Sequence, residues 1–231
     1  MAVPATSVVV LDRGNNTTCT VNLHGATVVS WRVNNQEQLF VSKQSVFDGK
    51  RPIRGGIPIV FPQFGPSNTG PQHGFARISR WELKKPPERL PTGDVEAMFQ
   101  LLDNEYTRTM WNYPFSLTYR LILREKELHF NISVYNPGAE TLSCNLLLHT
   151  YFKVPDVRRC QITGMRGCTY IDKRSPIALV WNPWLEKAKE IPDFGEEEFP
   201  NMVCVESGHV TSPIVLPPGT VFEASQILQV M

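Results

Sequence analysis

The feature that most constrains the fold is a succession of short, β-branched apolar runs separated by Gly, Asn and Pro turn signals. The clearest pair, FSLTYRLILR at 115–124 and ELHFNISVY at 127–135, alternates apolar and polar residues around a two-residue polar turn, which predicts a hairpin with one buried face. No segment between residues 1 and 170 keeps a helical period, and one helical turn is expected at 186–190. The other expected strands are 7–11, 18–23, 26–33, 38–41, 81–84, 95–102, 142–150, 178–181, 202–206, 213–216 and 221–229, with a Pro-rich connection at 86–93.

This pattern predicts an all-β protein folded as a large antiparallel β-sandwich. The chain of 231 residues has no internal repeat, no low-complexity segment and no linker, so a single domain spanning 1–231 is expected. Hydrophobic residues make up 42% of the chain, which is enough for a substantial core.

The net charge and the cysteine content limit the kinds of partner and binding site that are expected. The formal net charge of +1 argues against a nucleic-acid or membrane-surface partner and favours a small ligand. Five dispersed cysteines without CxxC spacing suit reduced thiols and give no support to a zinc site. No secretory signal or bilayer-length apolar run is visible, so a cytoplasmic protein is expected. The GxSxG, GxGxxG and P-loop signatures are absent, which favours chemistry without a cofactor.

The segment 51–80, RPIRGGIPIVFPQFGPSNTGPQHGFARISR, combines four arginines with paired glycines and several prolines. Proline and glycine favour a rigid irregular loop rather than a regular element. Arg51, Arg54, Arg77 and Arg80 on such a loop could form an anion pocket, because a guanidinium offers paired donors to carboxylate or phosphate. The alternative is that they are solvated loop charges. His73, beside a glycine, favours the functional interpretation.

Two polar residues stand at the ends of apolar strands. His149 ends LLLH and Glu206 ends MVCVE. Each could be structural or outward-facing, or the two could face one another across a sugar-sized gap and act as a general acid and base.

Other polar and aromatic positions have plainer interpretations. The acidic cluster DFGEEE at 193–198 is expected to be a solvated loop. Cys204 has no neighbouring base and is not expected to be a nucleophile. Trp181, Trp184 and Phe61 could form apolar walls or belong to the core.

Five ordered motifs, RGGIPIVFPQFGP, QHGFAR, LLLHTYF, VWNPW and DFGEEEFPNMVCVE, resemble the glucose-6-phosphate 1-epimerase family, also called hexose-6-phosphate mutarotases, and its plant members in particular. The resemblance covers nearly the whole chain. It implies the galactose-mutarotase-like supersandwich of the aldose-1-epimerase superfamily.

The resemblance also implies an activity, the interconversion of the α and β anomers of hexose 6-phosphates without metal or cofactor. His149 would then be the general acid and Glu206 the general base. We expect a monomer whose partner is a small hexose 6-phosphate. The alternative is a non-catalytic sugar-phosphate-binding or regulatory protein derived from an epimerase. The positions matched to substrate binding are Arg54, Gln72, His73 and Arg77.

The chain departs from the family before VWNPW, where members usually carry roughly fifty more residues, so the sandwich should lack strands and leave sheet edges unpaired. The missing part would contain an aspartate that the family uses to bind sugar. Asp172 and Asp193 are near in sequence but do not stand in that motif. A shortened epimerase with weak or no activity is therefore a hypothesis.

Overall fold

The computed structural model describes residues 7–164 and 179–231. In this part of the chain, antiparallel strands form three sheets, which confirms the all-β expectation. Two short helices, α1 (Glu105–Met110) and α2 (Trp184–Lys189), and three 3-10 turns, η1 (Ala76–Ile78), η2 (Val157–Arg159) and η3 (Glu196–Asn201), lie in the connections. The strands are β1 (Val8–Gly14), β2 (Thr17–Asn22), β3 (Thr27–Val33), β4 (Gln36–Glu37), β5 (Ile59–Val60), β6 (Glu82–Arg89), β7 (Val95–Leu102), β8 (Ser116–Leu123), β9 (Glu127–Tyr135), β10 (Leu142–Lys153), β11 (Leu179–Trp181), β12 (Met202–Leu216) and β13 (Val221–Gln229).

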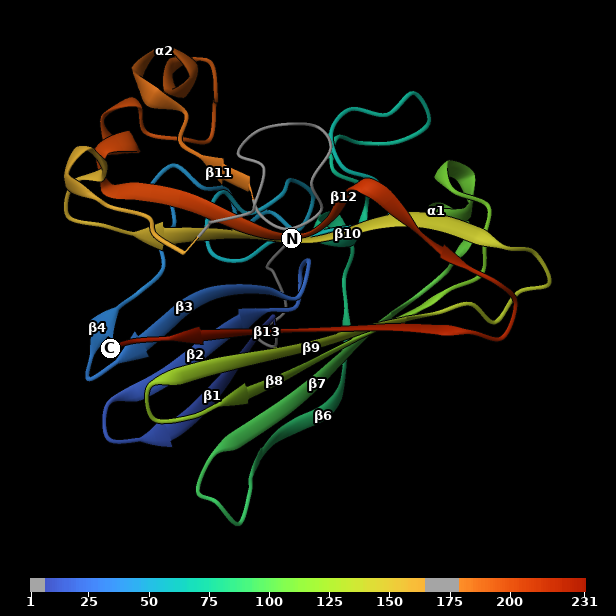
Figure 1. Ribbon diagram of the computed structural model, residues 1–231, viewed down its shortest axis with the longest axis horizontal. Helices are drawn as coiled ribbons and strands as arrows, with labels where there is room; N and C mark the ends of the chain where they lie inside the picture. The colour runs from blue at the N-terminus through green and yellow to red at the C-terminus, as the bar shows by residue number, and fades with distance from the viewer. Residues whose placement is uncertain (1–6, 165–178) are drawn as a thin grey trace.

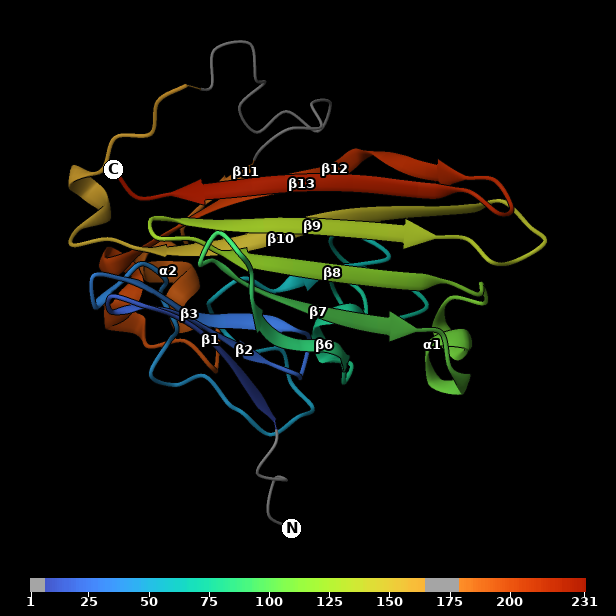
Figure 2. The same cartoon turned by 90° about the horizontal axis from the view of Figure 1, so that it is seen from below.

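The sheets have the orders β1-β2-β3-β4, β11-β12-β10-β5 and β13-β9-β8-β7-β6. In Figure 1 the strands β10 and β12 run above the β13–β6 sheet, with α2 and the loops of the first third of the chain on their far side. Figure 2 shows the long strands β13, β9, β8 and β7 lying side by side across the molecule. The architecture is therefore a layered sandwich with irregular structure covering one outer face.

The predicted hairpin 115–135 forms as β8 and β9, in a register that pairs Leu123 with Leu128. Strand β8 alternates buried and half-buried residues along its whole length. Its buried side chains, such as Tyr119, pack in the main core with Phe99 of β7 and Trp31 of β3. The alternation of apolar and polar residues was therefore sufficient to predict that one face of this sheet is buried.

Strand β10 divides its side chains between two environments. Leu146 and Leu148 belong to the main core between the sheets. His149 is also buried, and its neighbour but one, Tyr151, joins a second apolar cluster beneath α2 and η3. Because successive residues of a strand point to opposite faces, this strand carries core residues on one side and polar candidates on the other.

Some expected elements differ from those observed. The expected strand 38–41 is replaced by β4, two residues earlier, and by isolated bridges at Leu39 and Val41. Strand β6 continues through Pro86 and Pro87, which were expected in a connection. This is possible because β6 is an edge strand whose pairing with β7 is irregular at the prolines.

Strand β12 and the helices also differ from expectation. The segments 202–206 and 213–216 belong to one strand whose register shifts between them. Helix α1 was not predicted, since six residues held by a capping box of Asn104 and Thr107 are too short to show a period. Helix α2 begins two residues before the expected turn at 186–190. The start of the expected strand at Ala178 lies outside the described residues.

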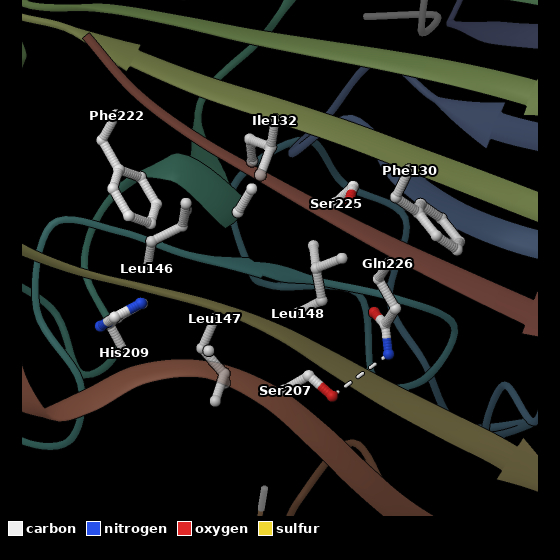
Figure 3. A pocket seen from close by; sticks show the side chains of 12 residues that line it. Phe130, Ile132, Leu146, Leu147, Leu148, Ser207, His209, Phe222, Ser225 and Gln226 are labelled. Carbon is white, nitrogen blue, oxygen red and sulfur yellow. Dashed lines mark hydrogen bonds between the residues drawn. The ribbon is translucent and has the colours of Figure 1, made fainter. Parts of the chain in front are cut away.

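One side of the sandwich is open. Strand β11 covers only Cys204 to Glu206 of β12, and β13 pairs with β9 alone in the described part of the chain. A groove of about 210 Å³ lies between these edges, and Gln226 donates to the hydroxyl of Ser207 across it at 3.2 Å (Figure 3). The groove is mostly apolar; its lining includes Phe130, Ile132, Leu146, Leu148 and Phe222. These edges agree with the expectation of missing strands.

The cysteine and membrane expectations can be compared with the described residues. Cys19, Cys144, Cys160 and Cys204 are free thiols, whereas Cys168 lies outside the described residues. Among the helices of the described part, none is long and apolar enough to cross a bilayer.

Candidate active site

His149 and Glu206 face each other on adjacent strands. They are direct partners in the register of β10 and β12, so both point away from the main core. His149 Nε2 lies 3.3 Å from Glu206 Oε1, and the two residues are 7% and 3% exposed. The expected sugar-sized gap between them is wrong, since the groups touch. They form one contiguous acid–base pair.

Burial controls the protonation of this pair. It raises the pKa of Glu206 to about 8, against the opposing effect of Arg77. It also lowers the pKa of His149 well below 6.5, helped by the neighbouring His73 ring and by the positive charges of Arg77 and Arg54. A close contact by itself favours an ion pair, but two charges in so little solvent cost more than their attraction returns when other hydrogen bonds are missing. At neutral pH the pair therefore holds one titratable proton, on Glu206.

Each partner also keeps one buried polar atom free. His149 Nδ1 and Glu206 Oε2 have no hydrogen-bond partner among the described residues. Buried polar atoms are normally paired, so these two atoms are available for hydrogen bonds to a bound ligand.

Arg77 supplies a buried positive charge next to the pair. It lies on η1, is 7% exposed and donates from Nη2 to the carbonyl of Gln72 at 2.7 Å. Its Nε has no partner within the described chain. Burial lowers the pKa of Arg77 to about 10, which still leaves it charged at neutral pH. A buried guanidinium with unused donors is suited to an anionic ligand.

Arg54 is held by a partner that the sequence did not suggest. Its Nε donates to Asp193 Oδ1 at 3.0 Å. Its side chain also hydrogen bonds with Tyr151, and its pKa is raised despite burial by Tyr151 and Asp193. The expectation that 193–198 is a solvated loop is wrong for Asp193 and Glu198, both of which are buried. The only available signal was the need of a buried arginine for a counter-charge.

His73 lies edge-on to His149, with ring centroids 6.0 Å apart. Its Nδ1 accepts the backbone N–H of Gly65 at 3.1 Å. Burial, followed by the charges of Arg77 and Arg54, lowers the pKa of His73 to about 4. A neutral ring that accepts at Nδ1 carries its proton on Nε2, so His73 presents a donor.

Of the remaining residues of this loop, Gln72 lies beside His73, whereas Arg51 and Arg80 lie in solvent. Gln72 is exposed, with its amide nitrogen 3.4 Å from His73 Nε2. Arg51 and Arg80 are exposed, so for these two the alternative of solvated loop charge is correct. The loop keeps its shape through close backbone contacts: a Cβ on Gly56, at φ +67°, would lie 2.1 Å from the carbonyl oxygen of Val28.

Aromatic rings form the wall around the pair. Tyr151 stacks on His149 with centroids 4.7 Å apart, and Trp181 meets the His149 ring edge-on at 6.2 Å. Phe61 is instead part of the main core, and Trp184 is exposed. Tyr151 was missed from the sequence, although its position two residues after His149 places it on the same strand face.

The contrast between two buried glutamates gives a stability prediction. Glu206 has a folded pKa of about 8 against an ordinary value of 4.5, so its contribution to stability falls as pH rises from 4.5 to 8. Glu206→Gln removes this penalty and is expected to raise the free energy of unfolding at pH 7 by roughly 2 to 3 kcal/mol, with little change near pH 4. Urea denaturation at the two pH values measures both effects.

Glu198 is the matched control, because its carboxylate is fully used. It accepts from the Ser42 hydroxyl at 2.6 Å and from the backbone N–H groups of Lys43 and Gly195 at 3.1 Å each. Glu198→Gln is expected to lower stability by about 1 to 3 kcal/mol, because it turns one acceptor into a donor facing a donor. A loss of stability in Glu206→Gln at pH 7 would contradict the raised pKa.

The fold and the site define a class of protein: an antiparallel sandwich of the mutarotase type, with a buried imidazole–carboxyl pair flanked by two guanidinium groups. The aldose 1-epimerase family model matches residues 7–178 and 171–229. The chain belongs to the aldose 1-epimerase family.

Individual relatives agree with this assignment. A "putative glucose-6-phosphate 1-epimerase" of Cenchrus ciliaris is 31% identical over 265 aligned residues, covering 91% of this chain and 80% of the relative. One of the same name from Escherichia coli is 34% identical over 155 residues, covering 65% of this chain and 50% of the relative. The crystal structure of a "putative mutarotase" from Salmonella typhimurium shares the fold, with a TM-score of 0.80, 22% identity and coverage of 96% of this chain and 90% of that one.

The alignments also locate the departure from the family. An alignment of 265 positions is longer than this 231-residue chain, so the Cenchrus ciliaris relative has residues that this chain lacks. The family match divides in two at 171–178, directly before VWNPW. Asp172 falls in this interval, outside the described residues. The shortened region expected from the sequence is therefore supported by two comparisons.

Proposed function

We propose that this chain interconverts the α and β anomers of hexose 6-phosphates. The observation that carries the proposal is the buried contact of His149 and Glu206 at 3.3 Å, with the charges of Arg54 and Arg77 close enough to depress the pKa of His149. The names of the relatives support the 6-phosphate as part of the substrate.

The spacing of the pair suits chemistry at one carbon. Opening a pyranose takes a proton from the anomeric hydroxyl and gives one to the ring oxygen, and both oxygens are bonded to C1. Two groups in contact can therefore serve both oxygens without moving apart. In the assignment that the family resemblance implies, Glu206 accepts from the hydroxyl while His149 donates to the ring oxygen. Rotation about C1–C2 and closure with reversed roles give the other anomer.

One proton in the pair is sufficient for this cycle. Opening moves it from His149 to Glu206 through the sugar, and closure moves it back. The pair with its proton on Glu206 therefore has the arrangement that faces the open-chain aldehyde. Binding of the cyclic sugar requires the proton on His149 instead.

The phosphate provides a physical reason for that shift. Arg77 lowers the pKa values of both His149 and Glu206, and Arg54 lowers that of His149 as well. A phosphate dianion bound to these guanidinium groups would cancel their field and raise the pKa of His149 more than that of Glu206, because both charges act on His149. Phosphate binding then promotes catalysis as well as affinity.

The sugar hydroxyls have donors and acceptors nearby. His73 offers its Nε2 proton, because its Nδ1 is occupied by the backbone of Gly65. Gln72 is exposed and can offer either end of its amide. The free thiols of the described part suit a reducing compartment, so we place the activity in the cytoplasm.

Exchange between glucose-6-phosphate anomers, followed by NMR magnetisation transfer with the spontaneous rate subtracted, tests the function. We expect an acceleration proportional to protein concentration and a smaller one for free glucose. Saturable binding of glucose-6-phosphate with no acceleration would instead select the non-catalytic binding protein. Absence of both binding and acceleration would reject the sugar-phosphate site.

The pH dependence of kcat/KM follows from the raised pKa of Glu206. Above about pH 8 the pair loses its only proton, so the rate is expected to fall there. Because the pKa of His149 is lowered, the fall of kcat/KM on the acidic side is expected well below pH 6.5. Because the substrate phosphate itself titrates near pH 6, the profile is to be measured with free glucose as well. If kcat/KM does not fall between pH 8 and pH 9, the shared-proton mechanism is contradicted.

A further inference from the structure

Strands β10 and β12 bring together three side chains that ligate transition metals. No metal site was expected from the sequence, because the cysteines lack metal-binding spacing. Cys204 and Glu206 nevertheless share one face of β12, and His149 stands opposite on β10. One ligand atom from each residue lies within 4.8 Å of the other two, and all three residues are buried. We propose that His149, Cys204 and Glu206 form a binding site for a borderline-soft divalent cation such as Zn²⁺, which excludes the sugar.

The observed geometry is close to that of a tetrahedral site. With Zn–N and Zn–O bonds of about 2.0 to 2.1 Å, two ligands at a tetrahedral angle stand roughly 3.3 Å apart. His149 Nε2 and Glu206 Oε1 are already at 3.3 Å. Cys204 closes the third position by a small side-chain adjustment, and the longer Zn–S bond of about 2.3 Å requires less movement. A fourth position remains for water.

The donor set and the charge balance indicate which cation fits. Nitrogen, sulfur and one oxygen suit zinc, whereas Mg²⁺ and Ca²⁺ prefer oxygen ligands alone. The nearby Arg54 and Arg77 oppose a cation. The Cys204 thiolate and the Glu206 carboxylate offset this, because their two negative charges neutralise the two positive charges of the metal.

Two further observations favour a ligand at this point. His149 Nδ1 and Glu206 Oε2 are buried without a partner in the described part of the chain, so the pair is not locked by other hydrogen bonds. Stacking of Tyr151 on His149 holds the imidazole plane in place at 4.7 Å. A metal on Nε2 and the carboxylate takes both proton-transfer atoms, so zinc and substrate cannot be bound together.

Calorimetric titration of the full chain with Zn²⁺ in phosphate-free buffer tests the proposal. We expect one site, with Mg²⁺ giving no heat. Cys204→Ser should weaken zinc by at least about 100-fold, since losing a ligand costs no less than losing a partner behind it. Cys160→Ser, which changes an exposed cysteine, should bind zinc like the wild type.

A spectroscopic measurement keeps the test valid if the Cys204 variant does not fold. Co²⁺ added to the wild-type protein should produce a thiolate-to-cobalt charge-transfer band that glucose-6-phosphate suppresses and that Cys160→Ser retains. Zinc binding unchanged in folded Cys204→Ser would overturn the proposal. Absence of the cobalt band, or loss of it only in Cys160→Ser, would overturn it as well. Because metal binding is measured directly, these outcomes do not depend on whether the chain is catalytically active.

Discussion

Replacing His149 by asparagine or Glu206 by glutamine is expected to lower the catalysed anomer exchange of glucose-6-phosphate by about 10²- to 10⁴-fold. In the proposed mechanism each change removes one of the two groups that exchange a proton with the sugar and leaves the proposed phosphate site intact. Binding of glucose-6-phosphate, measured by calorimetry, should change far less than the rate. The rate is measured by NMR exchange at pH 7 with the spontaneous reaction subtracted.

Matched controls exist for both substitutions. His129 lies on β9 beside Glu127, in a different sheet, and Glu223 is exposed on β13. His129→Asn and Glu223→Gln should keep the wild-type rate. Because non-additivity is expected for groups acting as a unit, the double variant should be little slower than the worse single one. A normal rate in either folded site variant would remove that residue from the mechanism.

Arg77→Met is expected to lower kcat/KM for glucose-6-phosphate by about 10- to 100-fold, because the proposed phosphate site loses a buried charged donor. For free glucose the same change should leave the rate unchanged or raise it, since the charge of Arg77 holds down the pKa of His149. Methionine is chosen because it fills most of the buried space that the arginine stem occupies.

Arg80 is the natural comparison for Arg77, since it lies three residues away on the same loop and is exposed. Arg80→Met should leave both substrates unaffected. Equal losses on glucose and on glucose-6-phosphate in the Arg77 variant would argue against a phosphate site. An effect confined to kcat with glucose-6-phosphate would favour the electrostatic role over simple binding.

The fold was largely accessible from the sequence where periodicity is strong. Strands β7, β9 and β13 have the bounds that alternation predicts, because one face of each packs against the core. Predicted and observed strands differ where contacts with distant parts of the chain determine the local structure. Strand β6 continues through Pro86 and Pro87 because its outer edge has no partner to lose in the described sheet. The half-exposed middle of β12 pairs with β10 from Ser207 to His209 and shifts register beyond that point, which the local sequence pattern does not reveal.

The candidate site likewise contains residues that the sequence identified and residues that it did not. His149 and Glu206 were visible because each interrupts an apolar run, but their contact depends on a register that only the fold sets. Asp193 was assigned to a solvated loop from its acidic neighbours, yet it is buried against Arg54. A loop charge acquires its partner through long-range packing, so no spacing in the sequence could identify this pair. Tyr151, by contrast, could have been predicted, because it lies two residues after His149 and therefore on the same face of the strand.

The shared proton of His149 and Glu206 is the central claim, and carboxyl ¹³C NMR of protein labelled at glutamate tests it most directly. Glu206→Gln identifies the resonance by its absence. We predict that the Glu206 carboxyl of the free protein titrates near pH 8. A Glu206 carboxyl that titrates near its ordinary 4.5, with or without the sugar phosphate, would contradict the shared proton.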